Sequence, residues 1–400
     1  AGRSPVTQAS FDVARARKDT PGCEEVVHFN NAGASLMPQP VLDAVIAHLQ
    51  LEARTGGYEA ADKNRALVER AYEAAATLIG ASPDEIALVE SATRAWDMAF
   101  YAIPFRPGDR ILTSMAEYAS NYIAFLQVAR RTGATVEVVP DDEHGQLSVD
   151  ALRALLDERV RLVAITHVPT NGGLVNPAAE VGRVAKEAGA LYLLDACQSV
   201  GQMPVDVRAI GCDMLATTGR KWLRGPRGTG FLYVRREVLD RLDPPMLDLH
   251  AARWVAPDRY ELRRDARRFE SWEANYAARI GLGAAIEYAM SWGIENIWHR
   301  IRSLADRLRG RLREIPGVTV RDLGVEQCGI VTFTVEGVEA TAVRDRLAQH
   351  RINVTVSTAS STLLDMQRRG LSELVRASVH YYNTDEEVER FCEALQGLAR

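Results

Sequence analysis

The stretch LATTGRKWLRGPRGTGFLYV, residues 215–234, places a lysine in a glycine-rich loop between two apolar runs. The runs LATT and FLYV have the length and composition of buried strands. The loop between them holds Lys221 together with a proline, several glycines and three arginines. A lysine that is simply exposed to solvent does not need a glycine-rich loop between two buried strands. The loop therefore indicates a chemical role for Lys221.

Further strand-like runs extend this pattern toward the N-terminus. Short apolar runs stand at 86–90, 110–114, 135–140, 161–166, 191–196, 214–218 and 230–234. Amphipathic stretches, 119–133 and 177–190 among them, lie between the first five. Alternation of strand and helix predicts an α/β fold, with a mostly parallel seven-stranded sheet covered on both faces.

The pattern changes after residue 235. A charged segment at 250–275 looks irregular, and long helical stretches and further strand-like runs follow it. We therefore expect a large ligand-binding domain over residues 25–275 and a smaller C-terminal α+β domain over residues 290–400. The N-terminal segment 1–24 is expected to pack near the small domain.

Composition narrows the classes of function. The 400 residues are 47% hydrophobic and 25% charged, with a formal net charge of −5. This predicts a soluble globular protein that binds neither nucleic acid nor a membrane. Five scattered cysteines without CxxC favour a reducing compartment, and no apolar run reaches the roughly 18 residues of a membrane span. The predicted location is cytoplasmic.

Several other chemistries lack their motifs. The eight histidines form no HExxH or HxH pattern, so no metal site is expected. The sequence GPRGTG differs in spacing from the dinucleotide-binding GxGxxG and follows a late strand, which argues against a nicotinamide dehydrogenase. No DNA-binding segment is evident, so a non-catalytic regulator is not favoured.

Polar residues that follow the predicted strands define a candidate site. In an open α/β sheet, ligands bind at the carboxyl ends of the strands. Asp195 ends the apolar run LYLLD, and a carboxylate there is costly unless it is paired, although an Asp can also simply cap a turn. With Lys221 after the next strand, an acid and an amine are expected to face one crevice.

Neighbouring residues suit a phosphate and an aromatic ring. Ala92 and Thr93 open a predicted helix whose free N–H groups attract anions, while Thr218 and Arg220 flank Lys221. Tyr118 offers a ring for stacking, and Gln198 is three residues beyond Asp195. Together these groups fit pyridoxal 5'-phosphate (PLP), with Lys221 forming the Schiff base and Asp195 holding the pyridine nitrogen protonated. Crowding by Arg220, Arg224 and Arg227 is expected to lower the pKa of Lys221.

A family resemblance rests on seven motifs that run from about residue 25 to the end of the chain. They are HFNNAGAS, SATRAW, THVPTNGGLVNP, LLDACQSVG, TTGRKWLRGPRGTGFLY, RRFESWE and RASVHYYNTDEEVERF. In these motifs and their order the chain resembles the class V aminotransferase family of fold-type I PLP enzymes. That family includes cysteine desulfurases, isopenicillin N epimerase-like proteins and C–S lyases, and its members are usually homodimers.

The resemblance implies a role for each matching position. Lys221 and Asp195 would be catalytic, and Arg376 would grip the substrate α-carboxylate, with Asn31, Ala32 and Gly33 also at the substrate. Gln198 would contact the ring hydroxyl, with Thr170 or Asn171 near the same edge, and Tyr118 would stack on the ring. The phosphate would be held by Ala92, Thr93, Thr218 and Arg220.

The chain also departs from the family pattern. Desulfurases carry a nucleophilic cysteine on a loop upstream of the carboxylate arginine, and the position 15 residues before Arg376 is Ser361. A hydroxyl does not accept sulfur as a thiolate does. Trp272 and Glu273 stand where relatives place smaller groups, and Tyr58 is a candidate to reach a partner's site.

These departures suggest which reaction to expect. With a desulfurase disfavoured, we expect a lyase that performs β-elimination on a cysteine S-conjugate or sulfoxide, giving pyruvate, ammonia and a sulfur product. Epimerisation is the alternative expectation, followed by transamination or a decarboxylating oxidative deamination. The sequence also predicts a homodimer that acts on a small amino acid substrate.

Overall fold

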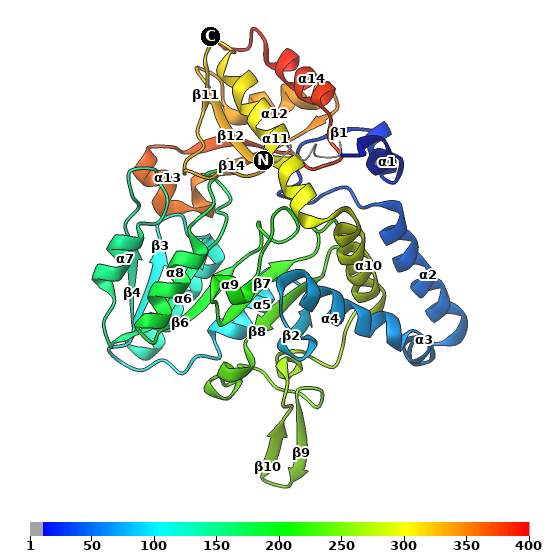
Figure 1. The fold of residues 1–400 in the computed structure, drawn as a ribbon, viewed down its shortest axis with the longest axis vertical. Helices are drawn as coiled ribbons and strands as arrows, with labels where there is room; N and C mark the ends of the chain where they lie inside the picture. Colours follow the sequence, from blue (N-terminus) through cyan, green and yellow to red (C-terminus); the bar gives the residue numbers. More distant parts are fainter. Residues whose placement is uncertain (1–10, 400) are drawn as a thin grey trace, which may run out of the picture.

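A seven-stranded sheet forms the centre of the protein, as seen in a computed structural model that describes residues 11–399 (Figure 1). Its strand order is β2-β8-β7-β6-β5-β3-β4. The neighbours β7-β6-β5-β3-β4 are parallel, and β8 is antiparallel to both β2 and β7. The strands are β2 (Ile86–Val89), β3 (Arg110–Ser114), β4 (Thr135–Val139), β5 (Val160–Thr166), β6 (Leu191–Asp195), β7 (Met214–Thr218) and β8 (Gly230–Val234). The predicted mostly parallel α/β sheet is confirmed.

Alternate side chains of these strands enter two separate apolar cores, as expected of a sheet covered on both faces. One core joins residues such as Leu194 and Leu215 to α4 (Arg65–Ile79), α8 (Ala178–Glu187) and α10 (Tyr276–Trp292). The other core joins residues such as Leu193 and Ala216 to α5 (Ala92–Phe100) and α6 (Ala119–Thr132). The central strands β6 and β7 are thereby buried along their whole length, whereas the edge strand β4 is partly exposed.

Four further helices belong to the part of the protein built on the seven-stranded sheet. These are α2 (Gln39–Thr55), α3 (Gly57–Lys63), α7 (Val149–Leu155) and α9 (Val207–Ile210). Helices α2 and α4 both pack on α10 (Figure 1). None of the helices within residues 11–399 is long and apolar enough to cross a membrane.

A second sheet of four strands is formed by residues that follow α10 in the chain, in the order β11-β12-β15-β14. Its strands are β11 (Val318–Val320), β12 (Ile330–Val335), β14 (Thr355–Thr358) and β15 (Glu373–Ser378), and they pair antiparallel. Its helices are α11 (Ile294–Arg313), α12 (Ala340–Gln349), α13 (Leu363–Arg369) and α14 (Asp385–Leu395). The domain boundaries at residues 25, 275 and 290 stay a prediction.

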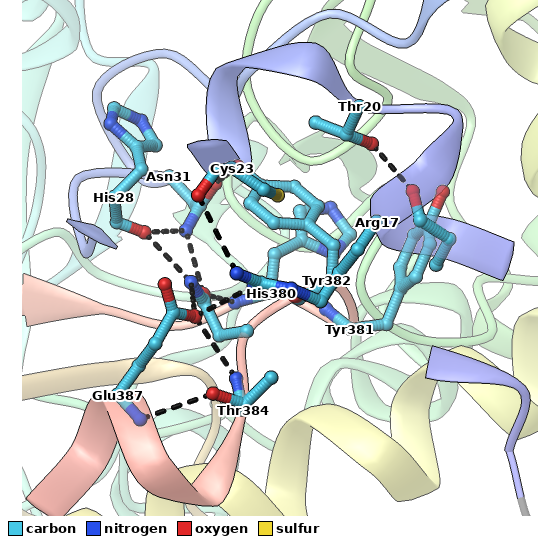
Figure 2. A network of polar contacts seen from close by, with 12 residues as sticks. Arg17, Thr20, Cys23, His28, Asn31, His380, Tyr381, Tyr382, Thr384 and Glu387 are labelled. Carbon is cyan, nitrogen blue, oxygen red and sulfur yellow. Dashed lines mark hydrogen bonds and ion pairs between the residues drawn. The ribbon is translucent and has the colours of Figure 1, made fainter. Parts of the chain in front are cut away.

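The N-terminal part of the chain is tied to this second sheet. Strand β1 (Val27–His28) pairs parallel with β13 (Ile352–Asn353). Arg17, next to the end of α1 (Val13–Lys18), donates to Glu387 Oε1 at 3.0 Å and to the Tyr382 carbonyl at 2.9 Å (Figure 2). Residues 1–10 of the predicted N-terminal segment lie outside the described residues.

The charged segment 250–275 is only partly irregular, so the sequence-based expectation was wrong there. It contains an antiparallel hairpin, β9 (Ala252–Ala256) and β10 (Arg259–Leu262), that projects from the body of the protein away from the four-stranded sheet (Figure 1). Trp254 is 80% exposed at this hairpin. Because neither face of the hairpin is buried, its sequence lacks the apolar alternation by which strands are recognised.

Candidate active site

A cavity at the carboxyl ends of the central strands brings together most of the predicted site residues. Its lining includes Ser91 and Thr93 at the start of α5, Tyr118 before α6, Thr170, and Lys221 after β7. The remaining lining residues are Ala92, Asn121, Thr166, Val168, Asp195, Cys197, Gln198 and Arg220. Parallel strands end at one edge of the sheet, which is why residues over 100 positions apart in the chain share this cavity.

Lys221 lies in a setting that favours its neutral amine. Burial lowers the pKa of Lys221, and the charges of Arg220 and Arg376 lower it further, while Cys197 and Asp195 oppose the change. The sequence-based expectation that Arg220, Arg224 and Arg227 lower the pKa of Lys221 was right for Arg220 alone. Arg227 is exposed, and the Arg224 guanidinium turns away to the Tyr381 hydroxyl at 2.7 Å and Thr20 Oγ1 at 2.6 Å.

Asp195 is buried and held by two hydrogen bonds. Its Oδ2 accepts from Asn121 Nδ2 at 2.8 Å, and its Oδ1 accepts from the Cys197 backbone N–H at 3.0 Å. Burial raises the pKa of Asp195, whereas these donors and the charge of Lys221 lower it. A buried carboxylate held by two such donors is suited to pair with a protonated ring nitrogen.

The opening of α5 and the Lys221 loop form a concentration of anion-binding groups. Ser91 caps α5 by accepting from the Arg94 N–H at 3.0 Å, and Ala92 and Thr93 of the first turn, whose N–H groups the cap does not use, line the cavity. Arg220 donates to Thr218 Oγ1 at 3.3 Å and lines the cavity, while Thr218 itself is buried behind it. This donor set matches a phosphate ester.

Arg376 on β15 is buried beside the cavity. Its Nη1 donates to Thr170 Oγ1, and its Nε has no hydrogen-bond partner among the described residues. Burial lowers the pKa of Arg376 to about 10, so the side chain is still a cation at neutral pH. An incompletely paired buried guanidinium is a good receptor for a carboxylate.

Other predicted site residues form hydrogen bonds with other residues of the chain. Gln198 Nε2 donates to the Ala32 carbonyl at 3.0 Å, and Gln198 Oε1 accepts from Trp222 Nε1 at 2.8 Å. Asn31 donates to the His28 and Ser378 carbonyls (Figure 2), while Gly33 packs against Asn30. None of Asn31, Ala32 and Gly33 lines the cavity.

The loop at Ser361 is held by a cluster of hydroxyl groups around Asn171. Asn171 Nδ2 donates to Ser361 Oγ and to Thr362 Oγ1, both at 2.8 Å, and Asn171 Oδ1 accepts from Ser357. The amide of Asn171 is therefore used up by this loop, and Asn171 does not line the cavity. Thr170 is the member of the predicted pair that does.

Among the residues near the cavity that sequence reasoning missed are Glu117, Asn121 and Cys197. Asn121 and Cys197 line it, and Glu117 lies immediately behind Asn121, to which it is hydrogen-bonded. Each of them is within three residues of a residue that the sequence did single out, Tyr118 or Asp195. All three follow a strand of the central sheet, so their positions after β3 and β6 are the sequence signal that could have identified them.

Trp272, Glu273 and Tyr58 lie away from this cavity. Glu273 and Tyr58 instead line a surface groove of about 910 Å³, and Trp272 is half exposed with its backbone N–H donating to Asp248 Oδ2 at 2.7 Å. In a single chain these residues contribute nothing to the cavity.

Comparisons with known proteins agree with this geometry. The family model for Aminotransferase class-V matches residues 27–391. A probable cysteine desulfurase of Methanothermobacter thermautotrophicus is 34% identical over 96% of this chain and 97% of the relative. The apo structure of a cysteine desulfurase from Thermococcus onnurineus is similar with a TM-score of 0.91 and 30% identity, covering 98% of this chain and 99% of that one.

The fold and the site define a PLP-dependent enzyme of fold-type I. A structure with glycine covalently linked to PLP, 24% identical, shares the fold with a TM-score of 0.86. The chain belongs to the class V aminotransferase family, and its cofactor is pyridoxal 5'-phosphate. Within that family, the expectation that a desulfurase is disfavoured was wrong. Relatives at 34% and 30% identity over nearly the whole chain are named cysteine desulfurases, which also overturns β-elimination from S-conjugates as the first choice.

Proposed function

We propose that this enzyme removes the sulfur atom from L-cysteine and leaves L-alanine. The observation that carries this proposal is the near full-length similarity to proteins named cysteine desulfurases, together with a cavity lined by a cofactor amine, Lys221, and a carboxylate receptor beside it, Arg376, which donates to Thr170 of the lining.

In this proposal the cofactor is held by residues of the cavity. Lys221 binds its aldehyde carbon, Asp195 its pyridine nitrogen, and Tyr118 and Gln198 its ring. The first turn of α5, at Ala92 and Thr93, holds the phosphate with Arg220 and Thr218. When bound, PLP supplies the electron sink that stabilises negative charge at the substrate α-carbon.

The side chains of the protein supply binding and proton transfer. Arg376 and Thr170 hold the α-carboxylate, which orients the substrate. Burial lowers the pKa of Lys221, which increases the neutral fraction of its ε-amine and favours Lys221 as the base that takes the α-proton. The same ammonium group can later return a proton.

Ser361 determines where the sulfur can go. Since no cysteine stands on this loop, and since burial raises the pKa of Cys197 in the cavity and so disfavours its thiolate, we propose that the accepting thiol is an external molecule, RSH. The substrate C–S bond breaks, the thiol sulfur bonds to the substrate sulfur, and the β-carbon gains a proton. Cysteine and RSH then become alanine and the persulfide RSSH, so atoms and electrons balance.

The test is product analysis with PLP-loaded protein, L-cysteine and dithiothreitol as the thiol. We expect alanine and sulfide in equal amounts, and a rate that depends on the thiol concentration. The Lys221→Ala variant serves as the blank. Pyruvate in place of alanine, or alanine at a rate independent of thiol, would contradict the proposal.

We also propose a homodimer, with the surface groove at its interface. The groove lies between the α2–α3 region and residues 246–248 and 269–279, and exposed apolar side chains line it: Leu49, Tyr58, Met246 and Leu247. Leu42 and Ile46 are also exposed on α2, the helix that carries Leu49. Such a patch fits a second apolar surface. Sedimentation of the wild type and of Leu49→Glu tests it, and a monomeric wild type would contradict it. A cytoplasmic location stays a prediction.

A further inference from the structure

Glu117 is a buried acid that none of the proposed catalytic steps uses. It lies in the segment that follows β3, immediately before Tyr118 in the chain, and its exposed fraction is 4%. Its carboxylate accepts from Ser114 Oγ at 3.0 Å, from Thr166 Oγ1 at 3.0 Å and from Asn121 Nδ2 at 2.8 Å. The three donors around this buried carboxylate favour its charged form and so oppose the effect of burial.

One amide connects Glu117 to Asp195. Asn121 Nδ2 carries two hydrogens and donates both to carboxylates, one to Glu117 Oε1 and one to Asp195 Oδ2, each at 2.8 Å. Asn121 therefore cannot turn its amide without losing both bonds. The orientation of the Asp195 carboxylate depends on Asn121, and that of Asn121 depends on Glu117.

The two carboxylates also interact by charge. The groups that face Glu117 are Ser114 on β3, Asn121 on α6, Thr166 on β5 and Asp195 on β6, and of these Asp195 is the charged one. Burial and, to a smaller extent, the Asp195 charge raise the pKa of Glu117 to about 7. The three hydrogen-bond donors oppose this rise. Both acids are stabilised when a cation lies beside them, and a protonated ring nitrogen at Asp195 is such a cation.

We propose that Glu117 is a positioning residue that acts through Asn121 to orient Asp195 and to strengthen its hold on the pyridine nitrogen of PLP. Glu117 lines no part of the cavity, so it acts on the cofactor from behind the residue that touches it. The proposal depends on cofactor binding and on no particular substrate. It therefore stands or falls independently of the proposed desulfurase reaction.

The first test is Glu117→Gln, which keeps the size of the side chain and removes its charge. Two properties of the substrate-free protein are measured: the Kd of PLP for the apoprotein, by fluorescence titration, and the pH midpoint of the cofactor absorbance band. With one negative charge fewer near the bound cation, we expect a Kd about tenfold higher and a midpoint about one pH unit lower.

A matched control is Glu85→Gln. Glu85 is equally buried but precedes β2, at the amino end of that strand and away from the cavity. We expect wild-type values of both properties for this variant. A Glu117→Gln protein that folds and has the wild-type Kd and midpoint would overturn the proposal.

The second test asks whether Glu117 acts through Asn121. Asn121→Ala and the double variant complete a cycle with Glu117→Gln. If Glu117 acts on PLP through Asn121, Glu117→Gln should change the Kd of PLP less than twofold in the Asn121→Ala protein. If the two substitutions instead change this Kd additively, Glu117 does not act through Asn121. Should Glu117→Gln fail to fold, Ser114→Ala replaces it. That change removes one donor to Glu117, so a smaller shift in the same direction is expected and an unchanged midpoint would overturn the proposal.

Discussion

The Ser361 hydroxyl accepts a hydrogen bond of 2.8 Å from the side-chain amide of Asn171. This contact joins the loop before α13 to the segment that follows β5, beside Thr170 in the cavity lining. The hydroxyl is thus linked to the cavity lining through Asn171, the chain neighbour of Thr170. Its position makes it the most informative place to alter the chemistry of the enzyme.

Replacing Ser361 by cysteine is expected to create a sulfur acceptor on the protein. With L-cysteine and no added thiol, the Ser361→Cys variant should form one persulfide per chain, because a thiolate attacks sulfur where a hydroxyl does not. Mass spectrometry after alkylation detects the added sulfur atom. Ser361→Ala is the control and should gain none; an unmodified Cys variant would show that this loop does not reach the substrate.

Lys221→Ala is expected to lose covalent attachment of the cofactor. After borohydride reduction, the wild-type chain should gain the mass of reduced PLP and the variant should not. Turnover should fall at least about 100-fold, since a positioned general base contributes that much or more. Lys186→Ala is the control, because Lys186 is exposed on α8. A variant that still turns over substrate normally would contradict the assignment of this cavity.

Arg376→Ala should weaken substrate binding and leave the cofactor in place. Loss of a charge-assisted contact to the α-carboxylate is worth about 2–3 kcal/mol, so kcat/KM should fall roughly 100-fold. Arg376→Lys should recover part of this loss, because it restores the charge without the bidentate geometry. Exposed Arg227→Ala should be unchanged. If the Arg376 variants retain wild-type kcat/KM, the carboxylate is bound elsewhere.

Two buried histidines should make the fold sensitive to acid. Burial lowers the pKa of His380 to about 3 and that of His167 to about 4, whereas both titrate near 6.5 when unfolded. Below pH 6.5 the unfolded state binds more protons, so stability falls as the pH falls toward 4. From pH 7 to pH 5 each histidine should remove about 2 kcal/mol from the free energy of unfolding.

Chemical unfolding at several pH values tests this expectation. His380→Asn should be less stable at pH 7, because His380 Nε2 is bonded to the Trp222 carbonyl at 2.9 Å and Nδ1 accepts from the Tyr381 N–H at 2.9 Å. It should also lose less stability on acidification than the wild type does. Equal slopes for the two proteins would show that His380 does not contribute to the acid response.

Much of the fold was predictable because its strands are buried on both faces. Such strands are short apolar runs bounded by turn residues, and the runs at 110–114, 214–218 and 230–234 match β3, β7 and β8 residue for residue. The hairpin β9–β10 was missed because it is exposed and carries no such run. The prediction of function erred for a different reason: it gave one residue, Ser361, more weight than the similarity of the whole chain to the desulfurases.

By itself, the sequence determined the α/β sheet, the cofactor, and Asp195 and Lys221 as residues at strand ends, since each is a property of local pattern. Only the tertiary structure decided which side chains meet. It turned Arg224 away from Lys221, brought Arg376 beside that amine from another sheet, and used the Asn171 amide to hold the Ser361 loop. It also joined Glu117 to Asp195 through Asn121, across three strands. Contacts between residues far apart in the chain depend on how strands are ordered in a sheet, and no local pattern encodes that order.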